Sequence, residues 1–165
     1  VTPAGNMPHS LTLLMGETVK AMMAFDKHMP QEVPRVALVD TFKDEAEEAL
    51  NVARTLRERL RGIRLDTPVE RGGVTPDLVK EVRVRLDLSG FKHVEILVSG
   101  GVTPERISEF VEQGAPVNSF GVGAHIASAV SNPYTSDIHE IEGKPIAKRG
   151  RIPGVTPNPR LDRVI

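Results

Sequence analysis

Four short apolar runs, rich in β-branched residues, alternate with segments of helical periodicity. This alternation limits the possible folds more than any other feature of the chain. The runs predict strands at residues 36–42, 62–66, 94–98 and 117–122. Strands that are separated by helices pair in parallel, and the helices cover the sheet. The sequence therefore predicts an α/β fold with a parallel sheet.

The segments between the strands carry the start and stop signals of helices. A helix over residues 44–61 has an acidic first turn and a basic last turn, which suits the helix dipole, and Gly62 is the expected residue just beyond its end. Thr75 and Thr103 each precede a proline and an acidic residue, which is typical of an N-cap and a first turn. A further helix is expected over about residues 124–130.

The two ends of the chain depart from this rhythm. Residues 11–29 have apolar side chains at helical spacing, which predicts one helix. Residues 134–141 and 144–148 flank the pair Glu142-Gly143, which predicts a β-hairpin with a tight turn. The chain after Gly150 is rich in proline and is expected to be extended.

The length of 165 residues suits one domain with a real core, but a complete (β/α)₈ barrel needs about 250 residues. We therefore expect a partial (β/α) barrel of parallel strands with flanking helices at residues 1–132. A C-terminal β-hairpin and an extended tail are expected at residues 133–165. The first residue is Val1 rather than Met, so we expect the chain to be a fragment or shortened form of a longer protein.

Composition excludes several classes of function. The net charge is −1 with acidic and basic residues interleaved, so the basic stripe of a nucleic-acid-binding protein is absent from the sequence. The sequence has no cysteine, which excludes disulfides and thiolate metal sites and fits a cytoplasmic protein. No apolar run approaches the ~20 residues of a membrane span, so no membrane partner is expected.

Carboxylates stand at the ends of the first two predicted strands. Asp40 and Asp66 occupy these positions, and in parallel α/β folds ligands bind at the carboxyl ends of the strands. A carboxylate at the tip of a buried strand needs a reason, because burying a charge is costly. Either the two acids point into one mouth, or each caps a helix.

Glycine-rich corners follow the third and fourth strands. Ser99-Gly100-Gly101 and Gly121-Val122-Gly123 let backbone N–H groups approach an anion closely, next to the start of a helix. Tight turns between strand and helix also use glycine, so each corner alone is a weak signal. Together the two corners indicate a site for a phosphate monoester, as in barrels that hold phosphate after their last strands.

Acids on one side and glycines on the other suit a sugar phosphate. The acids would bind ribose hydroxyls or Mg²⁺, and the glycines would bind the 5′-phosphate. Arg64 lies two residues before Asp66 and shares its face of the strand, so it either meets a second anionic group or forms a surface salt bridge.

The histidines do not form a zinc motif, because none has a second histidine at metal-ligand spacing. His9 has a distinctive context, since it lies in a loop just before a predicted helix. It either takes part in chemistry or is a helix-start residue beside Ser10 as the N-cap.

Several stretches resemble the nicotinate phosphoribosyltransferase family, especially its archaeal-type members. The matching stretches follow the family order and cover nearly the whole chain: Gly-Asn-Met-Pro-His-Ser-Leu (5–11), Ala-Leu-Val-Asp-Thr-Phe (37–42), Gly-Ile-Arg-Leu-Asp-Thr-Pro (62–68), Leu-Val-Ser-Gly-Gly (97–101), Phe-Gly-Val-Gly (120–123) and Gly-Lys-Pro-Ile-Ala-Lys-Arg (143–149). The resemblance implies the C-terminal portion of a type II phosphoribosyltransferase barrel, with the active site shared across a dimer. It also implies an absent amino-terminal domain, to which Lys148-Arg149 would return.

The resemblance further implies the substrates nicotinate and phosphoribosyl pyrophosphate, with Mg²⁺ and, in ATP-coupled members, ATP. His9 would be the phosphorylated histidine. Asp40 and Asp66 would face ribose, diphosphate and metal, with Arg64 beside them. The glycines of the two corners, together with Ser99 and Val122, would hold the 5′-phosphate.

Three other interpretations stay open from the sequence. A quinolinate phosphoribosyltransferase has the same barrel and adds a decarboxylation. A sugar-phosphate isomerase or aldolase barrel shares the glycine corners, but it should place a catalytic Lys or Glu at a strand tip, and the sequence offers neither. A non-catalytic half-barrel would bind a sugar phosphate or only self-associate through its open sheet edges.

Overall fold

The computed structural model describes residues 7–133 and 135–160. The chain divides into two compact units, Val1–Ala129 and Val130–Ile165, which are described separately. Within the described residues, no helix combines the length and the apolar character that crossing a membrane requires.

The first unit is built on a four-stranded parallel sheet. Its strands are β1 (Arg35–Leu38), β2 (Leu60–Leu65), β3 (Glu95–Val98) and β4 (Ser119–Phe120), in the order β1-β2-β3-β4. Ile63 at the centre of β2 pairs with Ala37 on one side and with Ile96 on the other. The predicted α/β fold with a parallel sheet is confirmed.

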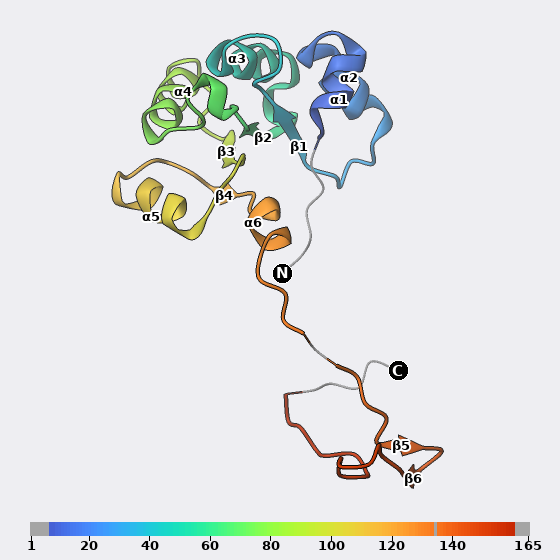
Figure 1. Ribbon diagram of the computed structural model, residues 1–165. Helices are drawn as coiled ribbons and strands as arrows, with labels where there is room; N and C mark the ends of the chain where they lie inside the picture. The colour runs from blue at the N-terminus through green and yellow to red at the C-terminus, as the bar shows by residue number, and fades with distance from the viewer. Residues whose placement is uncertain (1–6, 134, 161–165) are drawn as a thin grey trace. The chain divides into compact units, whose positions relative to one another are not determined.

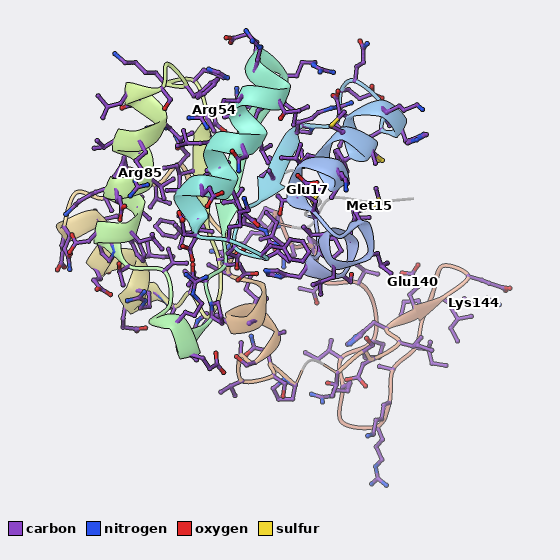
Figure 2. The ribbon with its side chains drawn as sticks, turned by 90° about the horizontal axis from the view of Figure 1, so that it is seen from above. Met15, Glu17, Arg54, Arg85, Glu140 and Lys144 are labelled. Atoms are coloured by element: carbon purple, nitrogen blue, oxygen red, sulfur yellow. The ribbon has the colours of Figure 1, made fainter. Side chains whose placement is uncertain are left out.

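A helix follows each strand, and the first three of these helices cover the outer face of the sheet. They are α3 (Glu45–Leu56), α4 (Pro76–Leu88), α5 (Pro104–Glu112) and the short α6 (Gly123–Ala127). Figure 1 shows α2 to α5 as an arc outside the four strands, which is the arrangement of a partial barrel. In Figure 2, Arg54 on α3 and Arg85 on α4 lie on the outer faces of their helices, and both side chains are exposed.

The predicted helix starts are confirmed by their caps. Asp44 accepts a hydrogen bond from Glu47 N, Thr75 accepts one from Leu78 N, and Thr103 accepts one from Arg106 N. Each cap satisfies an N–H group that has no partner inside the helix. The caps therefore set where the chain turns from each strand tip into the following helix.

The end of α3 differs from the prediction. The helix ends at Leu56, where Arg57 adopts a φ of 50° and opens the 3₁₀ turn η1 (Arg57–Arg59). Gly62 is not the residue after the helix but lies inside β2, where a Cβ atom would come within 3.0 Å of Glu95 O. Gly62 is thus required by close strand pairing rather than by a helix end.

The single helix predicted over residues 11–29 is also wrong. The segment forms two helices, α1 (His9–Met15) and α2 (Thr18–His28). Gly16 between them adopts a φ of 71°, a left-handed conformation that ends a helix and that glycine adopts without steric cost. As a result, Leu14, which the helical spacing placed on the apolar face of one long helix, is 85% exposed.

The core lies between the sheet and the helices. Its largest fully buried side chains include Leu65, Ile63 and Ile96 from the sheet, Leu86 from α4 and Phe110 from α5. Burial of such side chains supplies the main stabilising term of the unit. The same packing sets the positions of the strand ends, where the polar residues stand.

The second unit holds the predicted hairpin, with shorter strands. β5 (Glu140–Ile141) pairs antiparallel with β6 (Lys144–Pro145). The turn residues Glu142 and Gly143 have φ values of 50° and 76°, as a tight hairpin turn of type I′ requires. Two-stranded pairs with no third strand are marginal, which accounts for the short ladder. Tyr134, at the start of the predicted hairpin, lies outside the described residues.

Candidate active site

The carboxyl ends of the four strands present one row of polar and glycine residues. Asp40 lies two residues after β1, and Asp66, Ser99 and Gly121 directly follow β2, β3 and β4. Because the strands are parallel and adjacent, these positions share one edge of the sheet. The structure therefore brings together the residues that the sequence singled out.

His9 joins the two acids. Its Nε2 lies 3.1 Å from Asp40 Oδ2, and its Nδ1 lies 4.0 Å from Asp66 Oδ2. The side chain is 39% exposed, so it remains open to solvent on one side. His9 is the first residue of α1, and the N-cap position belongs to Pro8. The expected cap at Ser10 is therefore wrong, because the helix begins two residues earlier.

Asp40 is the more deeply buried acid, with a side chain that is 1% exposed. Burial raises the pKa of Asp40 above its usual value, and the hydrogen bond and charge of His9 partly oppose this rise. Within the described residues, its Oδ1 has no hydrogen-bond partner. An unpartnered buried carboxylate oxygen is costly, so this atom is a candidate contact for a ligand or a metal ion.

Arg64 connects the acids to the glycine corners. Its Nη1 donates to Asp66 Oδ2 at 2.8 Å and to Ser99 Oγ at 3.0 Å, and its Nη2 donates to Met7 O at 2.6 Å. The interpretation of Arg64 as a surface salt bridge is wrong, because its side chain is only 10% exposed. The guanidinium fork instead ties β2, β3 and the segment before α1 together.

Glycine at position 100 is required by Asp66. A Cβ atom at Gly100 would lie 2.8 Å from Asp66 Oδ1, and the residue has a φ of 85°. At the next corner, a Cβ atom at Gly121 would lie 3.0 Å from the Cβ of Ser99. The first corner thus adjoins Asp66 directly, and the second corner adjoins the first through Ser99.

The remaining residues of the glycine corners are open. A Cβ atom at Gly101 or Gly123 would meet no other atom within 4 Å, although the φ of 66° at Gly101 by itself favours glycine. Val122 precedes α6 and is half-buried. Open glycines next to a helix start leave backbone N–H groups accessible to an anion.

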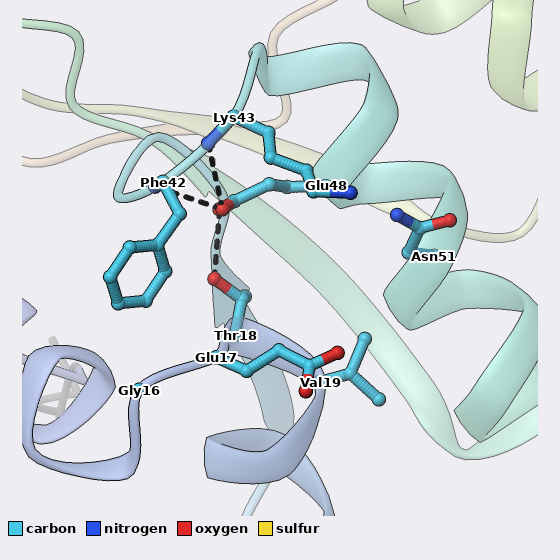
Figure 3. Close-up of a pocket in the computed structure, with 8 residues that line it drawn as sticks. All are labelled: Gly16, Glu17, Thr18, Val19, Phe42, Lys43, Glu48 and Asn51. Carbon is cyan, nitrogen blue, oxygen red and sulfur yellow. Dashed lines mark hydrogen bonds between the residues drawn. The ribbon is translucent and has the colours of Figure 1, made fainter.

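The sequence reasoning missed two buried glutamates on α3. Glu45 and Glu48 are 4% and 3% exposed. The charge pattern alone assigns them to the acidic first turn of the helix. Glu48 precedes Val52 by four residues, so the spacing places a carboxylate on the apolar face of the helix. Glu48 lines a pocket of about 230 Å³. Figure 3 shows the backbone at Phe42 and Lys43 directed toward its carboxylate.

The donor set at the strand tips fits Mg²⁺ better than a metal that needs many protein ligands. In the part of the chain that the structure describes, there is no group of three or more His, Asp, Cys or Glu side chains placed to hold a metal. Mg²⁺ commonly uses one or two carboxylates together with water and substrate phosphates. The unpartnered Oδ1 of Asp40 and the partly exposed carboxylate of Asp66 meet that requirement.

Comparison with known proteins identifies the family. The family described as quinolinate phosphoribosyl transferase, C-terminal domain, matches residues 3–132. The chain belongs to this family. A crystal structure of nicotinate-nucleotide pyrophosphorylase from Pyrococcus furiosus is 47% identical, with a TM-score of 0.74, over 93% of this chain and 39% of that chain.

Curated relatives in this phosphoribosyltransferase family are nicotinate phosphoribosyltransferases. The relative from Mycobacterium tuberculosis is 31% identical over 131 residues, and the relative from Bacillus subtilis is 28% identical over 123 residues. These matches cover 78% and 72% of this chain but only 27% and 24% of the relatives. The chain therefore spans about a quarter of the length of the relatives that it matches.

Proposed function

We propose that this chain is the phosphate-binding portion of a nicotinate phosphoribosyltransferase, which forms nicotinate mononucleotide from nicotinate and phosphoribosyl pyrophosphate. The observation that carries the proposal is the continuous row His9, Asp40, Asp66 and Gly100 at one edge of the sheet. The names of the curated relatives support it. The proposal extends to an archaeal-type member, on the strength of the 47% identity with the Pyrococcus furiosus structure.

The proposed reaction is a displacement at ribose C1. The bond to pyrophosphate breaks, positive charge develops on the ribose, and the pyridine nitrogen forms the new bond. In this proposal the negative charges of Asp40 and Asp66 stabilise the developing cation, and the backbone N–H groups of Gly101 and Gly123 hold the 5′-phosphate. Positioning and electrostatic stabilisation would be the main contributions of the chain.

Mg²⁺ is proposed at the two carboxylates of Asp40 and Asp66, where it would supply positive charge to the diphosphate leaving group. His9 is proposed as the histidine that ATP-coupled members phosphorylate. Its 39% exposed ring is accessible, and its contact with Asp40 orients the imidazole. Arg64 is proposed to hold Asp66 in place, because its guanidinium is already bonded to that carboxylate.

Calorimetry with nicotinate mononucleotide tests the proposal. The wild-type chain should bind it, and Asp66→Ala and Gly100→Val should each weaken binding at least about tenfold. Gly90→Val is the matched control, because Gly90 has a nearly identical φ of 87° but lies at the end of α4. Equal binding by the wild type, Asp66→Ala and Gly100→Val would remove the proposed site.

A quinolinate phosphoribosyltransferase is the second candidate. The name of the matching family favours it, and the 47% identical structure is that of a nicotinate-nucleotide pyrophosphorylase. Turnover of nicotinate and of quinolinate by the full-length parent protein distinguishes the two. Faster turnover of nicotinate supports the first candidate, and turnover of quinolinate with release of carbon dioxide supports the second.

A further inference from the structure

We propose that Glu48 and Glu45 are positioning residues, each of which holds the loop that follows one of the two acids, Asp40 and Asp66. This inference rests on the proposed function of those acids. It assigns a role to two buried carboxylates that the proposed reaction does not itself use.

Glu48 forms hydrogen bonds to each residue of the loop after Asp40, residues 41–43. Its carboxylate accepts hydrogen bonds from three successive backbone N–H groups, those of Thr41, Phe42 and Lys43, at 3.3, 2.9 and 3.1 Å. It also accepts one from the hydroxyl of Thr18 on α2 at 2.9 Å. Figure 3 shows the contacts of Phe42, Lys43 and Thr18 converging on this one carboxylate.

The side chains of this loop contribute little packing. Phe42 is 47% exposed, Lys43 is exposed, and a pocket of about 230 Å³ lies beside them. An apolar side chain at position 48 would leave three N–H groups without this acceptor. The conformation of the chain next to Asp40 therefore depends on hydrogen bonds to Glu48 rather than on burial.

Glu45 holds the loop that follows the second acid, Asp66. Thr67 directly follows Asp66, is buried, and donates its hydroxyl to Glu45 Oε1 at 2.7 Å. Arg71 in the same loop lies 3.7 Å from that oxygen. Residues 68–72 beyond Thr67 are exposed, so this contact is the anchor nearest to Asp66 on its carboxyl side.

The two glutamates stand three residues apart in the first turn of α3 and therefore on one face of the helix. The N-terminal end of a helix favours negative charge, which offsets part of the cost of burying two carboxylates. One rigid helix thereby sets the spacing between the two acid-bearing loops. A loss of either contact should move one acid relative to the other without removing it.

The test compares Glu48→Gln and Thr67→Val with Glu47→Gln. Glu47 lies on the same turn of α3 but is exposed, and its carboxylate meets the exposed ammonium of Lys43 rather than the loop backbone, so its variant is the matched control. Binding of nicotinate mononucleotide is measured by calorimetry, and the backbone amide signals of Asp40 and Asp66 are recorded by NMR. We expect at least about tenfold weaker binding for the two test variants, with shifted signals at the adjacent acid, and no change for Glu47→Gln.

Thr18→Val separates positioning from stability. It removes the contact of Glu48 with α2 but leaves the three loop N–H contacts, so it should lower the melting temperature without weakening binding. If Glu48→Gln does not fold, Thr67→Val decides the question, because it changes no charge. Wild-type binding by both test variants would overturn the inference.

Failure of the proposed function gives a different result. In that case the wild-type chain itself does not bind nicotinate mononucleotide. The amide signals of Asp40 and Asp66 then decide the positioning role alone. Unchanged signals in Glu48→Gln and Thr67→Val would overturn it, and signals shifted beyond those of Glu47→Gln would support it.

Discussion

Asp66 Oδ1 occupies the place that any side chain at position 100 would need, because a Cβ atom at Gly100 would lie 2.8 Å from it. The tip of β2 and the corner after β3 are therefore matched to each other. The carboxylate of Asp66 can keep its position only if residue 100, which follows a different strand, has no side chain.

Gly100→Ala should destabilise the chain by more than the backbone cost of its left-handed conformation, which is about 1–2 kcal/mol. The added methyl group also displaces the carboxylate of Asp66. Gly90→Ala is the control, because Gly90 has a φ of 87° but open space around it. Urea unfolding of both variants measures the difference, and equal losses would show that the contact between Gly100 and Asp66 has no energetic weight.

Asp40→Asn should raise the free energy of unfolding at pH 7. Burial raises the pKa of Asp40 in the folded state above its ordinary value of 3.8. A raised folded pKa stabilises the protein only while the group is protonated, so that stabilisation is complete below the unfolded pKa and is lost as the pH rises through the folded pKa. The advantage of Asn should therefore shrink as the pH falls from neutral through the folded pKa, and it should be smallest below the ordinary value of 3.8. Denaturant unfolding of the variant and the wild type from neutral to acidic pH measures this difference. A variant that is less stable than the wild type at neutral pH would contradict the prediction.

Arg64→Lys should cost about 2–3 kcal/mol, because one ammonium group cannot reach Asp66, Ser99 and the carbonyl of Met7 together. The cost stays below that of breaking a fully buried ion pair, since the Asp66 side chain is 22% exposed. Arg85→Lys on the exposed face of α4 should change stability by less than about 0.5 kcal/mol. Chemical denaturation measures both, and a similar small effect for the two variants would count against the assigned role of Arg64.

Leu86→Ala should cost about 2–5 kcal/mol, because Leu86 on α4 is fully buried against the sheet. Leu88→Ala on the same helix should be nearly neutral, since Leu88 is 84% exposed. Thermal unfolding of the pair tests whether α4 faces the sheet in this register. Equal losses of stability in the two variants would mean that α4 presents a different face to the sheet.

The isolated chain should form a dimer or larger assembly. In the described sheet, β1 and β4 are the outer strands, and each pairs on one side only. Unpaired strand edges favour association with another chain. Light scattering measures the mass in solution, and a clean monomer at all accessible concentrations would contradict this prediction.

The sequence by itself determined the order of strands and helices and the residues at the strand tips. Periodicity and capping are local, so Thr75 and Thr103 could be assigned as N-caps without knowledge of the fold, and the helix after β1 could be placed to within one residue of its start at Glu45. The parallel sheet follows from the alternation, and it places Asp40 and Asp66 at one edge. The acids and glycines at that edge indicated a sugar phosphate, and the family stretches added the expectation of nicotinate and phosphoribosyl pyrophosphate as substrates.

Only the tertiary structure decided which partner each polar residue has. Gly62 resembles a helix end in the sequence but serves strand pairing, because the limit on its Cβ comes from Glu95 on another strand. Arg64 resembles a surface residue because its partners, apart from Asp66, are distant in sequence. Glu48 resembles a helix-dipole residue, although its burial and its four donors depend on how α2 and the loop after β1 meet α3. Contacts between distant segments leave no periodic signal in the chain, so a single sequence cannot specify them.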